Sequence, residues 1–152
     1  MFKRRREKLK ADLLNENLEY LQKLKSFVLQ LRSIYERLAK TKIEKDVLSI
    51  CKTSQKILQT MIDDNSKISG QRLLIDYYLP ELVQILNQYI AIKSNSISST
   101  NAADTLKQIE DFIPIAKKAF KKMLENKITQ RSSDIDVDIK VMFDKLKSKR
   151  LV

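Results

Sequence analysis

The chain has 152 residues, which suits a single domain, and it contains one glycine, two prolines, one cysteine and no histidine. So few turn-forming residues exclude a β-sandwich, and the lack of histidine excludes catalytic triads and histidine-containing zinc sites. The formal charge of +11 points to anionic partners.

Most of the positive charge lies at the start of the chain. Residues 1–45 carry 13 basic and 6 acidic groups, whereas residues 46–93 carry 5 of each. No stretch reaches the roughly 18 to 20 apolar residues of a membrane-spanning helix, and no secretory signal is recognisable. We therefore expect a cytoplasmic protein that forms one helical domain over residues 1–152.

The first predicted helix spans about residues 7–39. Its apolar residues recur at alternating steps of three and four, which is the period of an amphipathic helix. Two adjacent stripes form one broad face, wide enough for two neighbouring helices. These stripes comprise Tyr20, Leu24, Phe27, Leu31, Ile34 and Leu38, and next to them Leu14, Leu18, Leu21, Val28 and Tyr35. The turns before Leu9 lack such a face, so we expect the basic residues 1–8 to project or fray.

The same spacing predicts a second helix over residues 43–63, with Cys51 on its buried side. Asp63 to Ser66 and the following Gly70 are turn-forming, so the chain reverses direction before a third helix over about residues 71–93. The predicted inner residues of this third helix are Leu73, Tyr77, Leu82, Ile85, Tyr89 and Ile92.

Two prolines interrupt the remaining helical patterns. Pro80 lies inside the third helix, where proline removes one backbone hydrogen bond, so we expect a kink or short break between Asp76 and Leu79. Residues 94–101 are rich in serine, asparagine and threonine, which is typical of a flexible loop. A fourth helix is predicted over about residues 102–131, with a second kink at Pro114.

The last segment is ambiguous, because residues 134–139 alternate between acidic and apolar side chains as an edge strand does. A helix is favoured, since Ser133 can cap it together with Asp136 three residues later. Ile135, Ile139, Met142 and Leu146 then continue on one face. The sequence therefore predicts an all-α fold, an antiparallel bundle of four to five long amphipathic helices, two of them kinked at proline.

The sharpest candidate site is a basic cluster at the amino terminus, interrupted by Glu7. Such a cluster attracts an anionic membrane surface or an acidic protein, and it attracts nucleic-acid phosphate in the same way. Nucleic acid is the least favoured of these partners, because no groove-reading or stacking module accompanies the cluster. A solvated helix start that aids solubility explains the same pattern. The cluster consists of Lys3, Arg4, Arg5, Arg6, Lys8 and Lys10.

Two further groups are candidates for a surface site. The predicted fourth helix carries four lysines on one side, which form either an anion-binding face or an ordinary solvated face. These are Lys117, Lys118, Lys121 and Lys122. Tyr77 and Tyr78 are adjacent, so about 100° separates them on a helix and only one can face the core squarely. The other is a candidate interface aromatic.

No metal ion or cofactor is expected. Asp134, Asp136 and Asp138 are spaced like the start of a calcium loop, but the required glycine and the closing glutamate are missing. Cys51 is interpreted as a core residue, because the chain has no histidine to activate it. The lack of a catalytic motif favours a protein without enzyme activity.

Two segments resemble the XpaC-type family, which is named for 5-bromo-4-chloroindolyl phosphate hydrolysis. Residues 77–89, with the sequence YYLPELVQILNQY, are similar to that family's YYLP segment and the apolar pattern that follows it. Residues 134–141, with the sequence DIDVDIKV, resemble its closing motif. Between them, residues 109–120 resemble a helical spacer that ends in an Ala-Phe pair. The resemblance covers about residues 37–151.

This resemblance implies a bacterial helical protein associated with toxic-anion (tellurite) resistance proteins of the TelA type. Our leading hypothesis is a non-enzymatic interaction protein that binds a protein partner, with its basic amino terminus near an acidic partner or the inner face of the membrane. The family name implies an alternative, a phosphate-ester hydrolase that uses carboxylates and a metal. Nonspecific binding of nucleic acid is a third hypothesis, and formation of a homo-oligomer stays open.

Overall fold

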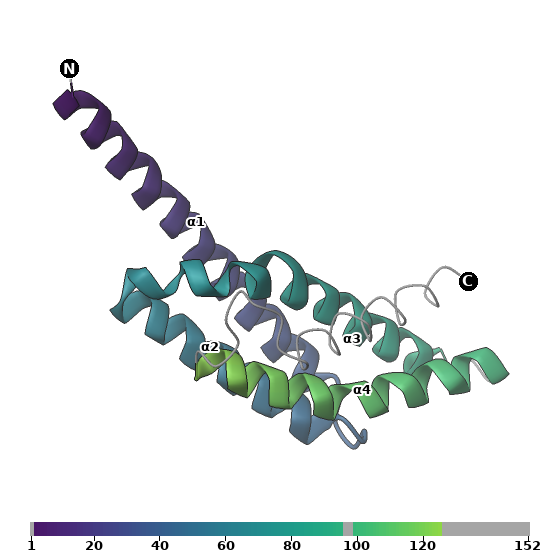
Figure 1. Cartoon of the computed structure of the whole chain (residues 1–152). Helices are drawn as coiled ribbons and strands as arrows, with labels where there is room; N and C mark the ends of the chain where they lie inside the picture. The colour runs from purple at the N-terminus through teal and green to yellow at the C-terminus, as the bar shows by residue number, and fades with distance from the viewer. Residues whose placement is uncertain (1, 96–98, 126–152) are drawn as a thin grey trace.

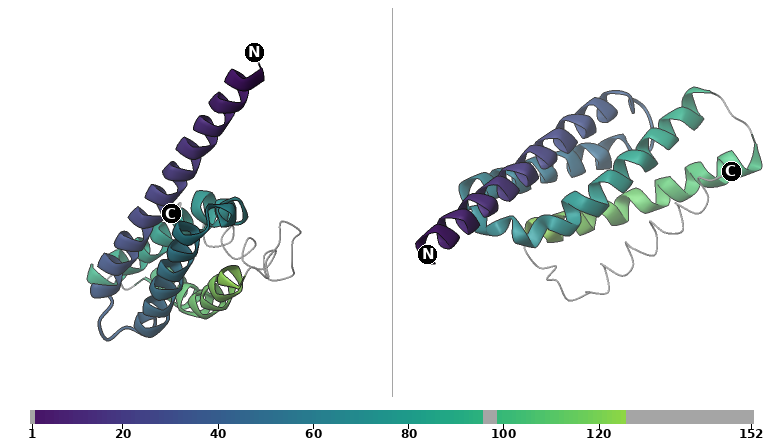
Figure 2. Two further views of the ribbon diagram at one scale, coloured as in Figure 1. Left: turned by 90° about the vertical axis from the view of Figure 1, so that its left-hand side faces the viewer. Right: turned by 90° about the horizontal axis from the view of Figure 1, so that it is seen from above.

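The computed structural model of the protein describes residues 2–95 and 99–125, and within these ranges it contains α-helices, short turns of other helix types and no strand. The helices are α1 (Phe2–Glu36), α2 (Glu44–Asp63), α3 (Leu79–Ser94) and α4 (Thr100–Leu124). Consecutive helices run in opposite directions (Figure 1 and Figure 2). The predicted all-α antiparallel bundle is therefore confirmed. The further helix predicted around residues 133–146 lies outside the described residues.

The core lies where the four helices meet. Helix α2 packs against α1 and α4, while α3 contacts both α1 and α4. Large side chains from every helix are fully buried there, since each helix turns its apolar stripe inward. The largest are Leu24 and Leu31 of α1, Ile50 and Ile57 of α2, Tyr89 of α3, and Phe112 and Phe120 of α4. Cys51 is buried among them, as predicted.

Helix α1 begins at Phe2, five residues before the predicted start, and ends at Glu36, three residues before the predicted end. The connection to α2 is short. Lys40 adopts a left-handed backbone conformation with φ 65°, and its backbone N–H donates a hydrogen bond of 2.8 Å to Glu44 Oε2 at the start of α2. This contact fixes the reversal between the two helices.

The reversal predicted after α2 is also present. The Asp64 carboxylate accepts hydrogen bonds from the backbone N–H and the hydroxyl of Ser66, at 3.0 and 2.7 Å. Two 3₁₀ turns follow, η1 (Asn65–Lys67) and η2 (Ser69–Gln71). The buried Gln71 side chain donates from Nε2 to the Met123 carbonyl at 2.9 Å, so the turn is tied to the end of α4.

Pro80 coincides with a change of helix type. A π-helix, η3 (Leu74–Tyr78), precedes α3, and the Leu79 N–H donates to the Leu74 carbonyl five residues earlier. Pro80 follows in the first turn of α3, and Leu73, Tyr78 and Leu79 all keep a right-handed helical backbone. The disturbance expected near this proline therefore takes the form of a π-turn, and the helix is not broken. Pro114 lies inside α4 and does not interrupt it.

The inner face predicted for the third helix is partly wrong. Leu73 is 52% exposed and Tyr77 is half-buried, whereas Leu74 and Tyr78 are buried. Tyr78 precedes the buried Leu82 by four residues and Tyr77 precedes it by five. Only the four-residue step keeps two side chains on the same side of a helix.

We expect Leu24→Ala to lower the free energy of unfolding by about 2–5 kcal/mol, because it leaves a cavity in the core. Leu14→Ala is the matched control on the same helix, since Leu14 is 61% exposed. Its effect should stay within about 0.5 kcal/mol. Urea unfolding followed by circular dichroism measures both values. Equal losses in the two variants would contradict the burial pattern of α1.

Candidate interaction surface

The first half of α1 extends beyond the bundle. Residues 3–15, which we call the arm, are all exposed, and Leu24 is the first buried residue of α1. At 1.5 Å per residue the arm is about 20 Å long. Figure 1 and Figure 2 show it standing clear of the other helices. The projection predicted for the basic start is confirmed, and the segment is helical from Phe2 onward.

The basic cluster lies on this arm. Lys3, Arg4, Arg5, Arg6, Lys8 and Lys10 are all exposed in the structure. Glu7 and Asp12 are the acidic residues of the arm, so its net charge is strongly positive. A positive helix held away from the body of the protein can approach an anionic partner without steric interference from the bundle.

Leucines are exposed along the same part of α1. Leu9 is 67% exposed, Leu13 53%, Leu14 61% and Leu18 53%. Sequence reasoning placed Leu14 and Leu18 on the buried face, which is wrong because the other helices do not extend far enough to cover them. Several large apolar side chains exposed on one helix favour a surface for association. The arm therefore combines two kinds of attraction, charge and apolar area.

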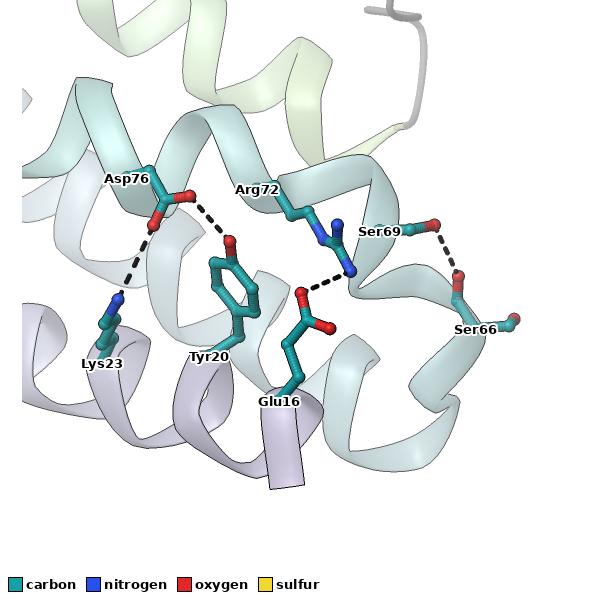
Figure 3. Close-up of polar contacts among 7 residues, drawn as sticks. All are labelled: Glu16, Tyr20, Lys23, Ser66, Ser69, Arg72 and Asp76. Atoms are coloured by element: carbon teal, nitrogen blue, oxygen red, sulfur yellow. Dashed lines mark hydrogen bonds and ion pairs between the residues drawn. The ribbon is translucent and has the colours of Figure 1, made fainter. Parts of the chain in front are cut away.

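Polar contacts fix the place where the arm leaves the bundle (Figure 3). The Tyr20 hydroxyl donates a hydrogen bond of 2.7 Å to Asp76 Oδ2. Lys23 Nζ lies 3.9 Å from Asp76 Oδ1, and an Arg72 guanidinium nitrogen lies 2.9 Å from a Glu16 carboxylate oxygen. These contacts join α1 to η3 and to Arg72, two residues before η3, so they hold the base of the arm.

The Tyr20 ring is the centre of this junction. Lys23 Nζ and the Arg72 guanidinium carbon lie 5.5 and 5.4 Å from its centroid, within the range of a cation–π contact. The hydrogen bond to the Asp76 carboxylate raises the pKa of the Tyr20 hydroxyl above its usual value. Sequence reasoning missed this junction, because its partners are 56 residues apart and carry no local motif.

The four lysines of α4 do not form one uniform face. Lys117 Nζ lies 3.2 Å from Asp46 Oδ1 of α2, so this lysine joins two helices of the bundle. Lys118 and Lys121 are exposed, and Lys122 is half-buried. The charge available to a partner on α4 is therefore smaller than the sequence suggests.

The two adjacent tyrosines divide as the helical geometry requires. Tyr78 is in the core, and Tyr77 is half-buried at its edge, with the two rings 5.4 Å apart in an edge-to-face arrangement. Tyr77 remains the candidate for an interface.

A catalytic centre is not apparent in residues 2–95 and 99–125. Within these ranges no three His, Cys, Asp or Glu side chains are grouped closely enough to hold a metal ion. A shallow hollow lies on the outer side of α1, lined by Gln22, Lys25, Ser26, Leu29, Gln30 and Ser33. One helix supplies all of these side chains, and none is an acid or a nucleophile with a paired base.

One part-buried carboxylate contact joins two helices. The Tyr89 hydroxyl donates to Glu110 Oε2 at 2.9 Å and joins α3 to α4. Burial, together with this hydrogen bond, raises the pKa of the Tyr89 hydroxyl far above its usual value. The phenol therefore stays protonated and acts as a hydrogen-bond donor.

Comparison with protein families gives a match over residues 2–142 to the family described as 5-bromo-4-chloroindolyl phosphate hydrolysis protein. The chain belongs to this family. The match includes the arm as well as the YYLP segment that carried the resemblance. No curated protein and no solved structure matches the chain. Among the described residues of this family member, no helix has the length and apolarity needed to cross a membrane.

We expect Tyr20→Phe to lower the free energy of unfolding by about 0.5–1 kcal/mol near pH 7, through loss of the hydrogen bond to Asp76. Because the folded pKa of Tyr20 is raised, the stabilisation is complete below the unfolded value of about 10 and is lost as pH rises through the folded value. The difference between wild type and variant should therefore shrink above pH ~10. Tyr35→Phe, a second half-buried tyrosine of α1, is the control, and urea unfolding across pH is the measurement. A difference that persists at high pH would contradict the assignment.

Proposed function

We propose that this family member is a non-enzymatic interaction protein whose arm binds an anionic partner. The observation that carries the proposal is the projection of a basic helix with exposed leucines away from a closed, well-packed bundle. A helix end that only improved solubility would gain nothing from four leucines in water, at an apolar cost of about 25 cal/mol for each Å² left exposed. A partner that covers them removes this cost.

The contacts at the base of the arm also support a role in binding. Ordering a free helix upon association costs conformational entropy, and a helix that is already held in one direction avoids part of that cost. The contacts of Tyr20 and Glu16 with the η3 region hold the base of the arm. The bundle thus holds the arm in a position that a partner can reach.

The partner that the family resemblance suggests is a toxic-anion (tellurite) resistance protein of the TelA type. An anionic membrane surface near such a protein would attract the same basic residues, at up to about 1 kcal/mol for each. We place the protein partner first, because a flat bilayer could take up the leucines on one side of the arm but not all four without also taking up basic side chains.

To test this function, the full chain and a variant lacking residues 1–10 are used as baits in lysate of the cells from which the protein comes. We expect the full chain to recover a TelA-type protein and the truncated chain to recover at least about tenfold less, because each 1.4 kcal/mol of lost binding is a factor of ten. Quantitative mass spectrometry measures the ratio. A variant with Lys118 and Lys121 changed to serine controls for loss of positive charge elsewhere. Equal recovery by all three baits would contradict the proposal.

The family description itself names a second candidate, hydrolysis of a phosphate ester. We expect purified protein to give no turnover of 5-bromo-4-chloroindolyl phosphate above buffer with magnesium, manganese or zinc, because the chain has no histidine and one buried cysteine. Colour formation over hours is the measurement, with an unrelated phosphatase as positive control. Turnover that depends on enzyme concentration and metal would establish the hydrolase and overturn the non-enzymatic proposal.

A further inference from the structure

Three of the arm's basic residues and the four exposed leucines in the first half of α1 form separate rows along the helix. Lys3, Arg6 and Lys10 are spaced at three and four residues, so they lie in one row. Leu9 and Leu13 form a second row, and Leu14 and Leu18 a third. With about 100° between successive residues, the basic row lies midway, about 70° from each leucine row.

This three-row face is the continuation of the side of α1 that packs in the bundle. Lys3, Lys10 and Asn17 precede the buried Leu24 at steps of seven residues, which returns to nearly the same side of a helix. The side that α2 and α3 cover farther along α1 is therefore open along the arm. A helix placed on the arm would extend the packing of the bundle.

More apolar surface is exposed at the adjoining end of the bundle. Ile62, in the last turn of α2, is 55% exposed, and Leu73, just before η3, is 52% exposed. Leu73 follows Arg72, whose ion pair with Glu16 marks the base of the arm.

From this arrangement we infer that the occupant of the arm is an amphipathic helix of another protein, with a central row of acidic residues between two apolar rows. The inference rests on the proposed function and specifies the chemistry of the partner. The acidic row pairs with Lys3, Arg6 and Lys10, and the two apolar rows cover the leucines on either side.

The same geometry argues against the other occupants. A second copy of the chain would bring two basic rows together. A flat bilayer would have to take in Lys3, Arg6 and Lys10 before both leucine rows reached its apolar layer. Nucleic-acid phosphates would pair with the basic side chains of the arm but would leave the leucines in water.

The test uses the full chain in its own cells, with p-benzoylphenylalanine in place of Leu13. The matched control carries the same photoreactive group in place of Asn15, which is exposed on the far side of the arm. We expect the Leu13 position to cross-link to a protein segment with acidic residues at steps of three and four, flanked by apolar residues. The Asn15 position should give little product. Mass spectrometry of the cross-linked peptide identifies the segment.

Two charge-reversal variants with the same net charge distinguish pairing with the row Lys3, Arg6 and Lys10 from general electrostatic attraction. Changing Lys3, Arg6 and Lys10 to glutamate should weaken binding of the synthetic peptide corresponding to that segment by about a hundredfold or more, because like charges would then face each other. Changing Arg4, Arg5 and Lys8 to glutamate should have a much smaller effect. Circular dichroism confirms that both variants keep the fold, and fluorescence anisotropy measures binding.

The outcomes distinguish this inference from the proposed function. Cross-links from Leu13 to lipid, to nucleic acid, to residues of this same chain or to a segment without an acidic row would overturn the inference and leave a binding role for the arm intact. Equal weakening by the two charge-reversal variants would do the same. Absence of any cross-link at Leu13 above the Asn15 control would overturn both.

Discussion

Helix α1 is longer than the helices that pack against it, and this difference in length determines which of its apolar side chains stay exposed. Helix α1 has 35 residues and is about 52 Å long, whereas α2 has 20 residues and is about 30 Å long. Burial of apolar side chains drives the packing of the bundle, but it can act only where a second helix is present. Tyr20 and Leu21 still pack against the core, and beyond them toward the amino terminus the leucines of α1 are exposed.

Two features stabilise the projecting arm. Residues of high helix propensity, mainly lysine, arginine, leucine, alanine and glutamate, keep the arm helical without tertiary contacts. At its base, Tyr20, Glu16 and Lys23 connect α1 to residues near η3 through a hydrogen bond and ion pairs. The arm is thus an extension of a structured helix. Its direction is set by contacts that cost little stability if they are lost, because they lie at the surface.

The family to which the chain belongs is described by phosphate-ester hydrolysis. Hydrolysis needs a nucleophile or a bound metal with groups that converge on it, and among residues 2–95 and 99–125 no three His, Cys, Asp or Glu side chains are grouped closely enough to hold a metal ion. The carboxylates of Asp46, Asp76 and Glu110 instead hold pairs of elements together.

The sequence by itself determined the all-α class, both ends of α2 to within one residue, the start of α4 to within two, a disturbance of the helix near Pro80 and the burial of Cys51, because these follow from local spacing and backbone chemistry. It also located the basic cluster. Only the tertiary structure decided where the apolar stripe of α1 stops being covered, which exposes Leu14 and Leu18, and that Tyr78 rather than Tyr77 enters the core. It alone brought Tyr20 to Asp76 and Lys117 to Asp46. Such outcomes depend on which helices lie side by side and how far each extends, and a local repeat of three and four residues carries no information about either.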